Sequence, residues 1–92
     1  MITIYAISTT ITNDFEITND VRIVTDHNQA STHIQNLFDE ELQRFEERYG
    51  ADIIVERDVD SLSFSIGKTG SFSEDGIMVT TQIENVMTKL GQ

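Results

Sequence analysis

The stretch that decides the fold runs from Asp26 to Gly50 and reads DHNQASTHIQNLFDEELQRFEERYG. Asp26 is a good helix N-cap, with Gln29 three positions later as in a capping box, and Ser31 is an alternative start. Apolar residues then recur at the i, i+3 and i+4 spacing of a helix, and they are Ala30, Ile34, Leu37, Phe38, Leu42, Phe45 and Tyr49. Gly50 readily takes the left-handed conformation that ends a helix. The pattern therefore predicts one long helix whose apolar stripe packs on a sheet.

The opposite face of this predicted helix is acidic. Four carboxylates fall away from the apolar stripe, and they are Asp39, Glu40, Glu46 and Glu47. Glu40 and Arg44 have the i, i+4 spacing of a favourable ion pair, but an exposed pair contributes only about 0.3–0.5 kcal/mol. We therefore expect packing to stabilise the helix, and the acidic face to meet either solvent or a partner.

Strands are predicted before the helix. Residues 1–12 are rich in Ile and Thr, with apolar side chains on both faces, which is typical of a central strand or of a strand with a bulge near 8–10. A turn at Asn13–Asp14 leads into a second strand, interrupted or bulged at Asn19. The apolar residues that share one face of this strand are Phe15, Ile17, Val21 and Ile23.

Further strands are predicted after the helix. Residues 52–58 form a strand around Ile53–Val55 and end in a turn at 58–60. Residues 61–66 then alternate, with serines outward and apolar side chains inward, as in an antiparallel strand with one exposed face. The inward residues are Leu62, Phe64 and Ile66. Turns at 67–70 and 74–76 enclose a short edge strand at 71–73.

The last segment combines two patterns. Ile77 and Val79 alternate as in a strand, whereas Thr81 and Glu84 have the spacing of a capping box before apolar residues at helical spacing. We expect a strand at 76–80 that runs into a helix at 81–90. The sequence thus predicts an α+β fold: an antiparallel sheet of four to five strands covered by one long helix, plus a short C-terminal helix.

Length and composition limit the classes of function. The 92 residues are expected to form a single domain over 1–92, because a chain of this size cannot build two cores. Sixteen Asp and Glu against six Lys and Arg give a net charge of −10, which disfavours nucleic acid and anionic membranes as partners. The chain has no cysteine, no N-terminal signal pattern and no long apolar run. We expect a cytoplasmic protein that binds neither free DNA nor membranes.

The motifs that would carry catalysis or metal binding are incomplete. Gly67–Thr69 is similar to the end of a phosphate-binding loop, but Leu62 stands where the first glycine of that loop is required. Asp58–Asp60 begins like a calcium loop that then lacks its glycine and its closing glutamate. His27 and His33 are six residues apart and point in different directions on a helix, so they do not chelate one metal. We expect no enzyme activity, no bound metal and no cofactor.

As a whole-chain profile, the protein resembles the small phage-encoded anti-CRISPR proteins. The profile consists of 92 residues without Cys or Pro, strong acidity, one α+β domain and no catalytic motif. The resemblance implies a non-enzymatic inhibitor that binds Cas proteins of a CRISPR ribonucleoprotein surveillance complex, type I above all, with contact to the guide RNA in some cases. It implies a block of target-DNA binding or of nuclease recruitment in the cytoplasm of an infected bacterial host. It transfers no site residues, because these proteins share no motif.

Two surfaces are candidates for the partner interface. The acidic helix face, with Asp39, Glu40, Glu46 and Glu47, suits an Arg- and Lys-lined channel that binds phosphates. The Ser- and Thr-rich strand faces, with Arg22, Arg57 and Lys68, suit an RNA backbone.

Two other functions are consistent with the sequence, in addition to the anti-CRISPR hypothesis. One is an acidic immunity or antitoxin-like protein that masks a basic nucleic-acid-binding partner, and the other is a structural protein whose acidity serves solubility. We expect a monomer or a small homo-oligomer.

Overall fold

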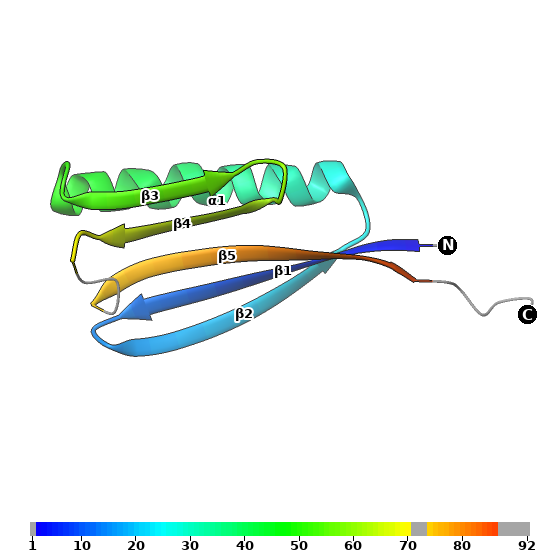
Figure 1. The fold of residues 1–92 in the computed structure, drawn as a ribbon, viewed down its shortest axis with the longest axis horizontal. Coiled ribbons are helices and arrows are strands. Elements are labelled where there is room, and N and C mark those ends of the chain that lie inside the picture. The colour runs from blue at the N-terminus through cyan, green and yellow to red at the C-terminus, as the bar shows by residue number, and fades with distance from the viewer. Residues whose placement is uncertain (1, 71–73, 87–92) are drawn as a thin grey trace, which may run out of the picture.

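The computed structural model describes residues 2–70 and 74–86, which form five strands and one helix (Figure 1). The elements in chain order are β1 (Ile2–Asn13), β2 (Glu16–Val24), α1 (His27–Tyr49), β3 (Ile53–Asp58), β4 (Ser63–Lys68) and β5 (Asp75–Val86). All neighbouring strands are antiparallel, and their order in the sheet is β2-β1-β5-β4-β3. The predicted α+β class, with an antiparallel sheet and one long helix, is confirmed.

The helix α1 has the boundaries and the buried stripe that the sequence predicts. The Asp26 carboxylate accepts a hydrogen bond of 2.8 Å from the Asn28 N–H, which satisfies one free donor of the first turn. Gly50 ends the helix at φ +61°, and its N–H donates to the Glu46 carbonyl. Four residues of the stripe are buried and three are partly buried against the core, namely Ala30, Ile34, Phe38 and Phe45, then Leu37, Leu42 and Tyr49.

The core lies between α1 and one face of the sheet. Alternate residues of the three middle strands point at the helix, and the most buried of them are Ile7, Phe64, Ile66, Ile77 and Val79. Phe38 of α1 meets Phe64 of β4 edge-to-face, with ring centroids 5.1 Å apart. Figure 1 shows α1 running alongside β3 and β4, with β2 at the far edge of the sheet. The helix therefore covers the sheet unevenly, and β2 receives the least cover.

The hairpin between β1 and β2 turns one residue later than predicted. Asn13 still pairs with Glu16, so the two loop residues are Asp14 and Phe15 rather than Asn13 and Asp14. Both have positive φ, 54° and 66°, as in a type I′ turn, whose twist matches that of the flanking strands. Pairing is continuous along the hairpin and β1 lies between β2 and β5, so the central-strand alternative for residues 1–12 is confirmed, and neither a bulge near 8–10 nor one at Asn19 occurs.

The turn residue Phe15 offers a test of backbone strain. Its φ of 66° is unfavourable for a residue with a side chain. Because 71% of its surface is exposed, packing of the ring offsets little of this conformational cost. Replacing Phe15 with Gly is expected to raise the free energy of unfolding by about 1 kcal/mol, because glycine takes this conformation without a steric penalty. Urea denaturation followed by circular dichroism measures the change. A loss of stability would mean that the phenyl ring stabilises the folded state despite its exposure.

The turns after the helix also differ from prediction by a few residues. The β3–β4 connection occupies 59–62, where Leu62 sits at φ +52° yet is buried, so it is inward as predicted but outside the strand. Asp58 accepts hydrogen bonds from the hydroxyl and the N–H of Ser61, which lower the pKa of its carboxyl below the usual value. Strand β4 continues through Lys68, so of the turn predicted at 67–70 only residues 69–70 lie outside a strand. The predicted turn at 74–76 was wrong, because Asp75 and Gly76 begin β5.

The C-terminal helix expected at 81–90 was wrong over 81–86. Strand β5 continues to Val86 and pairs with β1 along its whole length. The reason is long-range, since the inner edge of β1 needs a hydrogen-bonding partner and β5 supplies it. The Thr81 hydroxyl does not cap a helix but donates to the Leu62 carbonyl at 2.7 Å. Residues 87–90 of the expected helix and the edge strand expected at 71–73 lie outside the described residues.

Candidate partner-binding surfaces

We use the name acidic stripe for Asp39, Glu40, Glu46 and Glu47, which all lie exposed on one face of α1. This face is opposite the buried stripe, because residues 3, 4 and 7 positions apart share one side of a helix. Two carboxylates of the acidic stripe are held by glutamines one turn earlier. The Gln35 amide donates to Asp39 at 2.9 Å, and the Gln43 amide donates to Glu47 at 3.1 Å. The structure thus brings these four predicted site residues together on one exposed face.

The arginine predicted to pair with Glu40 points elsewhere. Arg44 binds Glu41 at 2.6 Å, an i, i+3 pair, and its guanidinium also lies 3.6 Å from the Asp75 carboxylate. Burial alone would lower the pKa of Arg44, but the hydrogen bond to Glu41 and the charge of Asp75 raise it above the usual value. The predicted Glu40–Arg44 pair was wrong, because Asp75 approaches the other side of Arg44 from the sheet.

Two of the three cations predicted for the competing interface, Arg57 and Lys68, are separated and engaged within the chain. The Arg57 guanidinium stacks over the Phe38 ring, 4.5 Å from its centroid, and donates to the Gln35 side chain. Lys68 binds Glu74 at 3.2 Å and lies 5.6 Å from the Tyr49 ring centroid. Arg57 and Lys68 stand four ladder positions apart on the β3–β4 hairpin, about 13 Å at strand spacing. Arg57 is linked through Gln35 to Asp39 of the acidic stripe, whereas Lys68 binds Glu74 at the other end of the hairpin.

The remaining described cations are also engaged inside the molecule. Arg22 lies on the helix side of β2, with a guanidinium nitrogen 3.4 Å from Nδ1 of His33. Partial burial and the charge of Arg22 lower the pKa of His33 below its usual value, so the ring is neutral at pH 7 and can accept from Arg22. Within residues 2–70 and 74–86, every Arg and Lys therefore contacts another side chain of the chain, and none of these contacts neutralises the acidic stripe.

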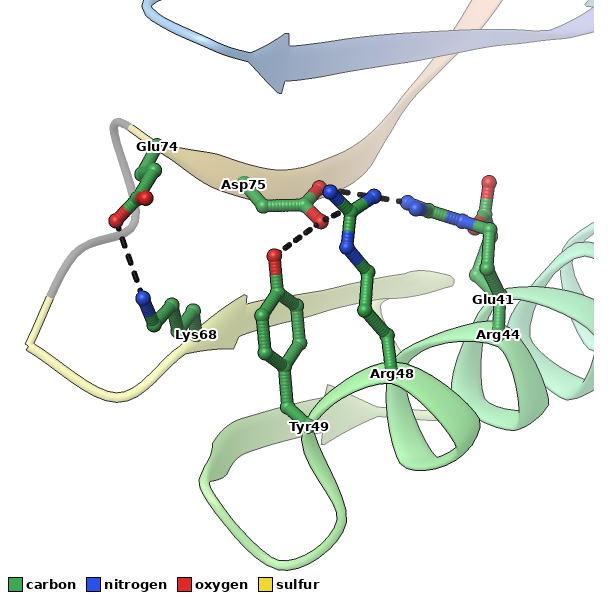
Figure 2. Close-up of polar contacts among 7 residues, drawn as sticks. All are labelled: Glu41, Arg44, Arg48, Tyr49, Lys68, Glu74 and Asp75. Atoms are coloured by element: carbon green, nitrogen blue, oxygen red, sulfur yellow. Dashed lines mark hydrogen bonds and ion pairs between the residues drawn. The ribbon is translucent and has the colours of Figure 1, made fainter.

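Asp75 is the centre of a polar cluster that sequence reasoning missed (Figure 2). The carboxylate is 2% exposed and accepts a 2.8 Å hydrogen bond from the Tyr49 hydroxyl. Guanidinium groups of Arg44 and Arg48 lie 3.6 and 3.7 Å from its oxygens. Residues 44, 48 and 49 share one side of the last helical turns, which is the sequence signal for a common acidic partner. That signal does not name Asp75, which was expected in a turn.

The chemistry of this cluster is that of a structural anchor. Burial and the hydrogen bond to Asp75 raise the pKa of the Tyr49 phenol above its usual value. A raised pKa keeps the phenol protonated, which is the reverse of what an activated nucleophile or base requires. The cluster ties the C-terminal end of α1 to the first residue of β5.

Neither a metal site nor a membrane-spanning helix occurs in the part of the chain that the structure describes. No three His, Asp or Glu side chains there are close enough together to hold a metal ion. No helix there is long and apolar enough to cross a membrane.

Comparisons of this chain with protein-family models, with curated proteins and with solved structures found no match.

Proposed function

We propose that this protein is a non-enzymatic phage inhibitor whose acidic stripe binds a basic nucleic-acid-binding surface of a Cas subunit. The target is a CRISPR surveillance complex of type I, and the consequence is that target DNA no longer binds. The observation that carries the proposal is the acidic stripe itself. It is a row of exposed carboxylates on the outer face of a packed helix, while the cations of the described residues contact other groups of the chain.

The charge density of the acidic stripe supports mimicry of a nucleic-acid backbone. Positions 39 to 47 span about 12 Å of helix axis at 1.5 Å per residue and carry four carboxylates, as two adjacent pairs (39/40 and 46/47) about 9 Å apart. One strand of B-DNA carries a phosphate about every 3.4 Å of its axis. A groove lined by Arg and Lys for a single strand therefore meets a similar density of negative charge on α1.

The rigidity of the helix supports the same proposal. The opposite face of α1 is anchored by Phe38 and Phe45 in the core and by the Asp75 cluster at its C-terminal end. Gln35 and Gln43 hold two of the carboxylates in place, so less side-chain freedom is lost on binding. A fixed row of charges also steers a basic partner into register, which raises the association rate at low salt.

The direct test measures binding of target DNA by a purified type I surveillance complex in the presence of excess inhibitor. We expect target binding to be lost, and with it the cleavage that recruitment of the nuclease brings about. If target DNA binds fully and is cleaved fully in excess protein, the proposal is overturned. If only cleavage is lost, the protein blocks recruitment, and the interface is then sought on the subunit that receives the nuclease. A purified basic nuclease in place of the Cas complex tests the immunity-like alternative.

Charge reversal in the acidic stripe tests the surface. The triple variant E40K/E46K/E47K is expected to weaken binding to the complex by roughly 100-fold, at about 1 kcal/mol for each lost charge contact. It should also flatten the dependence of affinity on salt, because fewer charges are neutralised at the interface. Surface plasmon resonance over a range of salt concentrations measures both effects.

The matched control changes the net charge equally at another place. The triple variant E16K/D20K/D60K reverses three exposed acids of β2 and of the β3–β4 turn. It is expected to retain most of the affinity. If both triple variants bind like the unmodified protein, the interface lies away from the acidic stripe; if both weaken equally, the net charge and not the stripe drives binding.

A further inference from the structure

One face of the sheet carries no helix and no further strand among the described residues, and it is buried only around Thr12, Gly67 and Gly76. The ladder register places the side chains opposite to α1 on β2 as Ile17, Asn19, Val21 and Ile23, and on β1 as Ile2, Ile4, Ala6, Ser8, Thr10 and Thr12. Three of these aliphatic side chains are largely exposed, Ile17 by 65%, Val21 by 60% and Ile23 by 64%. Ile54 and Met78 on the same face are 52% and 45% exposed. A row of exposed β-branched aliphatics on a flat sheet is typical of an interface.

The charge distribution separates this open face from the rest of the molecule. The parts of β1 and β2 that face away from α1 carry no charged side chain, although the chain has a net charge of −10. The acids Glu56, Asp58 and Glu84 lie toward the rim of the face. The acidic stripe lies on the other side of the sheet, on α1. The open face therefore suits a neutral partner that is itself apolar at its centre.

The dimensions of the chain agree with a missing layer. The Cα radius of gyration is 15.4 Å, whereas a compact domain of 92 residues has about 12 Å. An antiparallel sheet commonly leaves one face to solvent, and that face is then polar; here the face opposite to α1 instead carries exposed aliphatic side chains on β2.

The open face has a ridge and two hollows, and residues of the ridge lie at the same levels along the strands as the hollows. The ridge is the aliphatic row of β2. One hollow, of about 360 Å³, is lined by Ile54, Glu56, Ser65, Gly67, Lys68, Gly70 and Met78, and the other, of about 310 Å³, by residues that include Glu56, Asp58, Ser63, Met78 and Thr80. Ile17 pairs with Thr12, Thr12 pairs with Gly76, and Gly76 pairs with Gly67. Ile17 and Gly67 therefore lie at the same level along the strand direction. Val21 stands level with Thr80, through Ser8.

We propose that the open face binds a second copy of this chain, so that two sheets pack face to face. The two-fold axis runs parallel to the strands over β5, the middle strand of the sheet. This axis keeps each residue at its level along the strands and places β2 of one copy over β3 of the other. Ile17 then comes opposite Ile54 at the first hollow, Asn19 comes opposite Glu56, and Val21 lies level with Asp58 at the end of β3. The amide of Asn19 is free to donate there, because only its oxygen is used by Thr10.

The area is sufficient for a stable dimer. At about 3.3 Å per residue and 4.8 Å per strand, the face offers roughly 600 Å² of flat sheet in each copy, and side-chain relief adds to this. A standard interface buries about 800 Å² per partner. In this dimer the two acidic stripes point outward on opposite sides, so self-association leaves them accessible. The inference is independent of the proposed function.

Sedimentation equilibrium of the unmodified chain tests the dimer. We expect a concentration-dependent dimer that is stronger at high salt, since screening reduces repulsion between two copies of charge −10. Binding to a basic Cas surface has the opposite salt dependence, so the two interfaces are distinguishable. A chain that stays monomeric at every concentration and salt level overturns the proposal, whatever else covers the face.

Paired variants on β2 locate the interface. I17D places a charge against Ile54 of the partner copy, beside its Glu56, and is expected to weaken the dimer at least about 100-fold. T18D, on the other face of the same strand, adds the same charge and should leave the dimer intact. Circular dichroism and urea denaturation report whether each variant folds, and I17T keeps a β-branched residue if I17D does not fold. Folded I17D or I17T that dimerises like the unmodified chain overturns the proposal.

Cross-linking tests the axis, and the absence of cysteine from the chain makes it direct. A mixture of N19C and E56C copies is expected to cross-link with a short bismaleimide. N19C copies alone should not, because the two β2 strands lie four strand positions apart, about 19 Å. Strong cross-linking of N19C with itself would overturn the assigned axis, since it means that β2 packs on β2. The inhibition assay on I17D and sedimentation of E40K/E46K/E47K then show whether either interface fails without the other.

Discussion

Replacing Phe45 with Ala is expected to lower the free energy of unfolding by about 3–5 kcal/mol. Phe45 is 0% exposed and is the largest of the fully buried side chains. Its ring packs 5.9 Å from the Tyr49 ring, with the Arg44 guanidinium 4.5 Å from its centroid. Truncation removes the buried ring and leaves a cavity that a one-helix core cannot close, because the sheet on the other side is held by its ladder.

The size of this effect is large for so small a core. A domain of 92 residues has a total stability of about 5–15 kcal/mol, so one substitution removes about a fifth of it or more. Urea denaturation followed by circular dichroism measures the loss. Phe45→Leu keeps most of the volume and is the matched control, with an expected loss below about 1.5–2 kcal/mol. A loss under about 1 kcal/mol for Phe45→Ala would mean that the core does not depend on this ring.

Replacing Asp75 with Ala is expected to cost about 2–3 kcal/mol. The change leaves the Tyr49 hydroxyl without its acceptor in a partly buried site, and it releases two guanidinium groups from the start of β5. The arginines contribute less than the tyrosine, because their side chains are 41% and 58% exposed and solvent screens their charges. The expected loss is therefore smaller than the cost of breaking a fully buried ion pair.

Two variants separate the parts of this effect. Asp75→Asn keeps an acceptor for Tyr49 and removes only the charge, so we expect a loss of about 1 kcal/mol. Tyr49→Phe removes the donor and keeps the ring, with a similar loss. If Asp75→Ala is no more costly than Asp75→Asn, the hydrogen bond to Tyr49 does not stabilise the fold. Urea denaturation of the three variants side by side gives the comparison.

The part of the fold that could be predicted is the part that local signals specify. Asp26, the apolar stripe and Gly50 lie within one continuous segment, and a helix satisfies its own backbone hydrogen bonds. Its start, its end and its buried residues therefore follow from periodicity. The strands were recognised as well, but the ends of β1 to β4 moved by one or two residues where the partner strand decided which residue still pairs, as at Asn13 and Lys68, and β5 ends six residues later than predicted.

In the C-terminal segment, pairing with a distant strand overrides the local sequence signals for a helix. Thr81 and Glu84 have the spacing of a capping box, yet both belong to β5. A short helix there would gain a few hydrogen bonds near the cap. The strand instead pairs with β1 over twelve positions, with a partner about 70 residues away in sequence at the middle of the ladder. Nothing within residues 81–86 reports that partner.

The candidate site divides in the same way. The acidic stripe is a periodicity of one helix, so its four residues were found together from the sequence. The Asp75 cluster joins residues 26 or more positions apart, and the choice of Arg44 between Glu40, Glu41 and Asp75 depends on how β5 approaches α1. Sequence spacing predicts which side chains share a helix face. It does not predict which side chains of the sheet contact that face.

By itself, the sequence determined the α+β class, the span and buried face of α1, the exposed position of the acidic stripe, and the shared face of Ile17, Val21 and Ile23. Only the tertiary structure decided that this shared face points away from α1 and is uncovered, that the cations of the described residues are engaged within the chain, and that Asp75 anchors the helix end. The physical reason is range. Periods of 3.6 and 2 are set by neighbouring residues, whereas strand order, register and the choice of which sheet face the helix covers are set by contacts between distant segments.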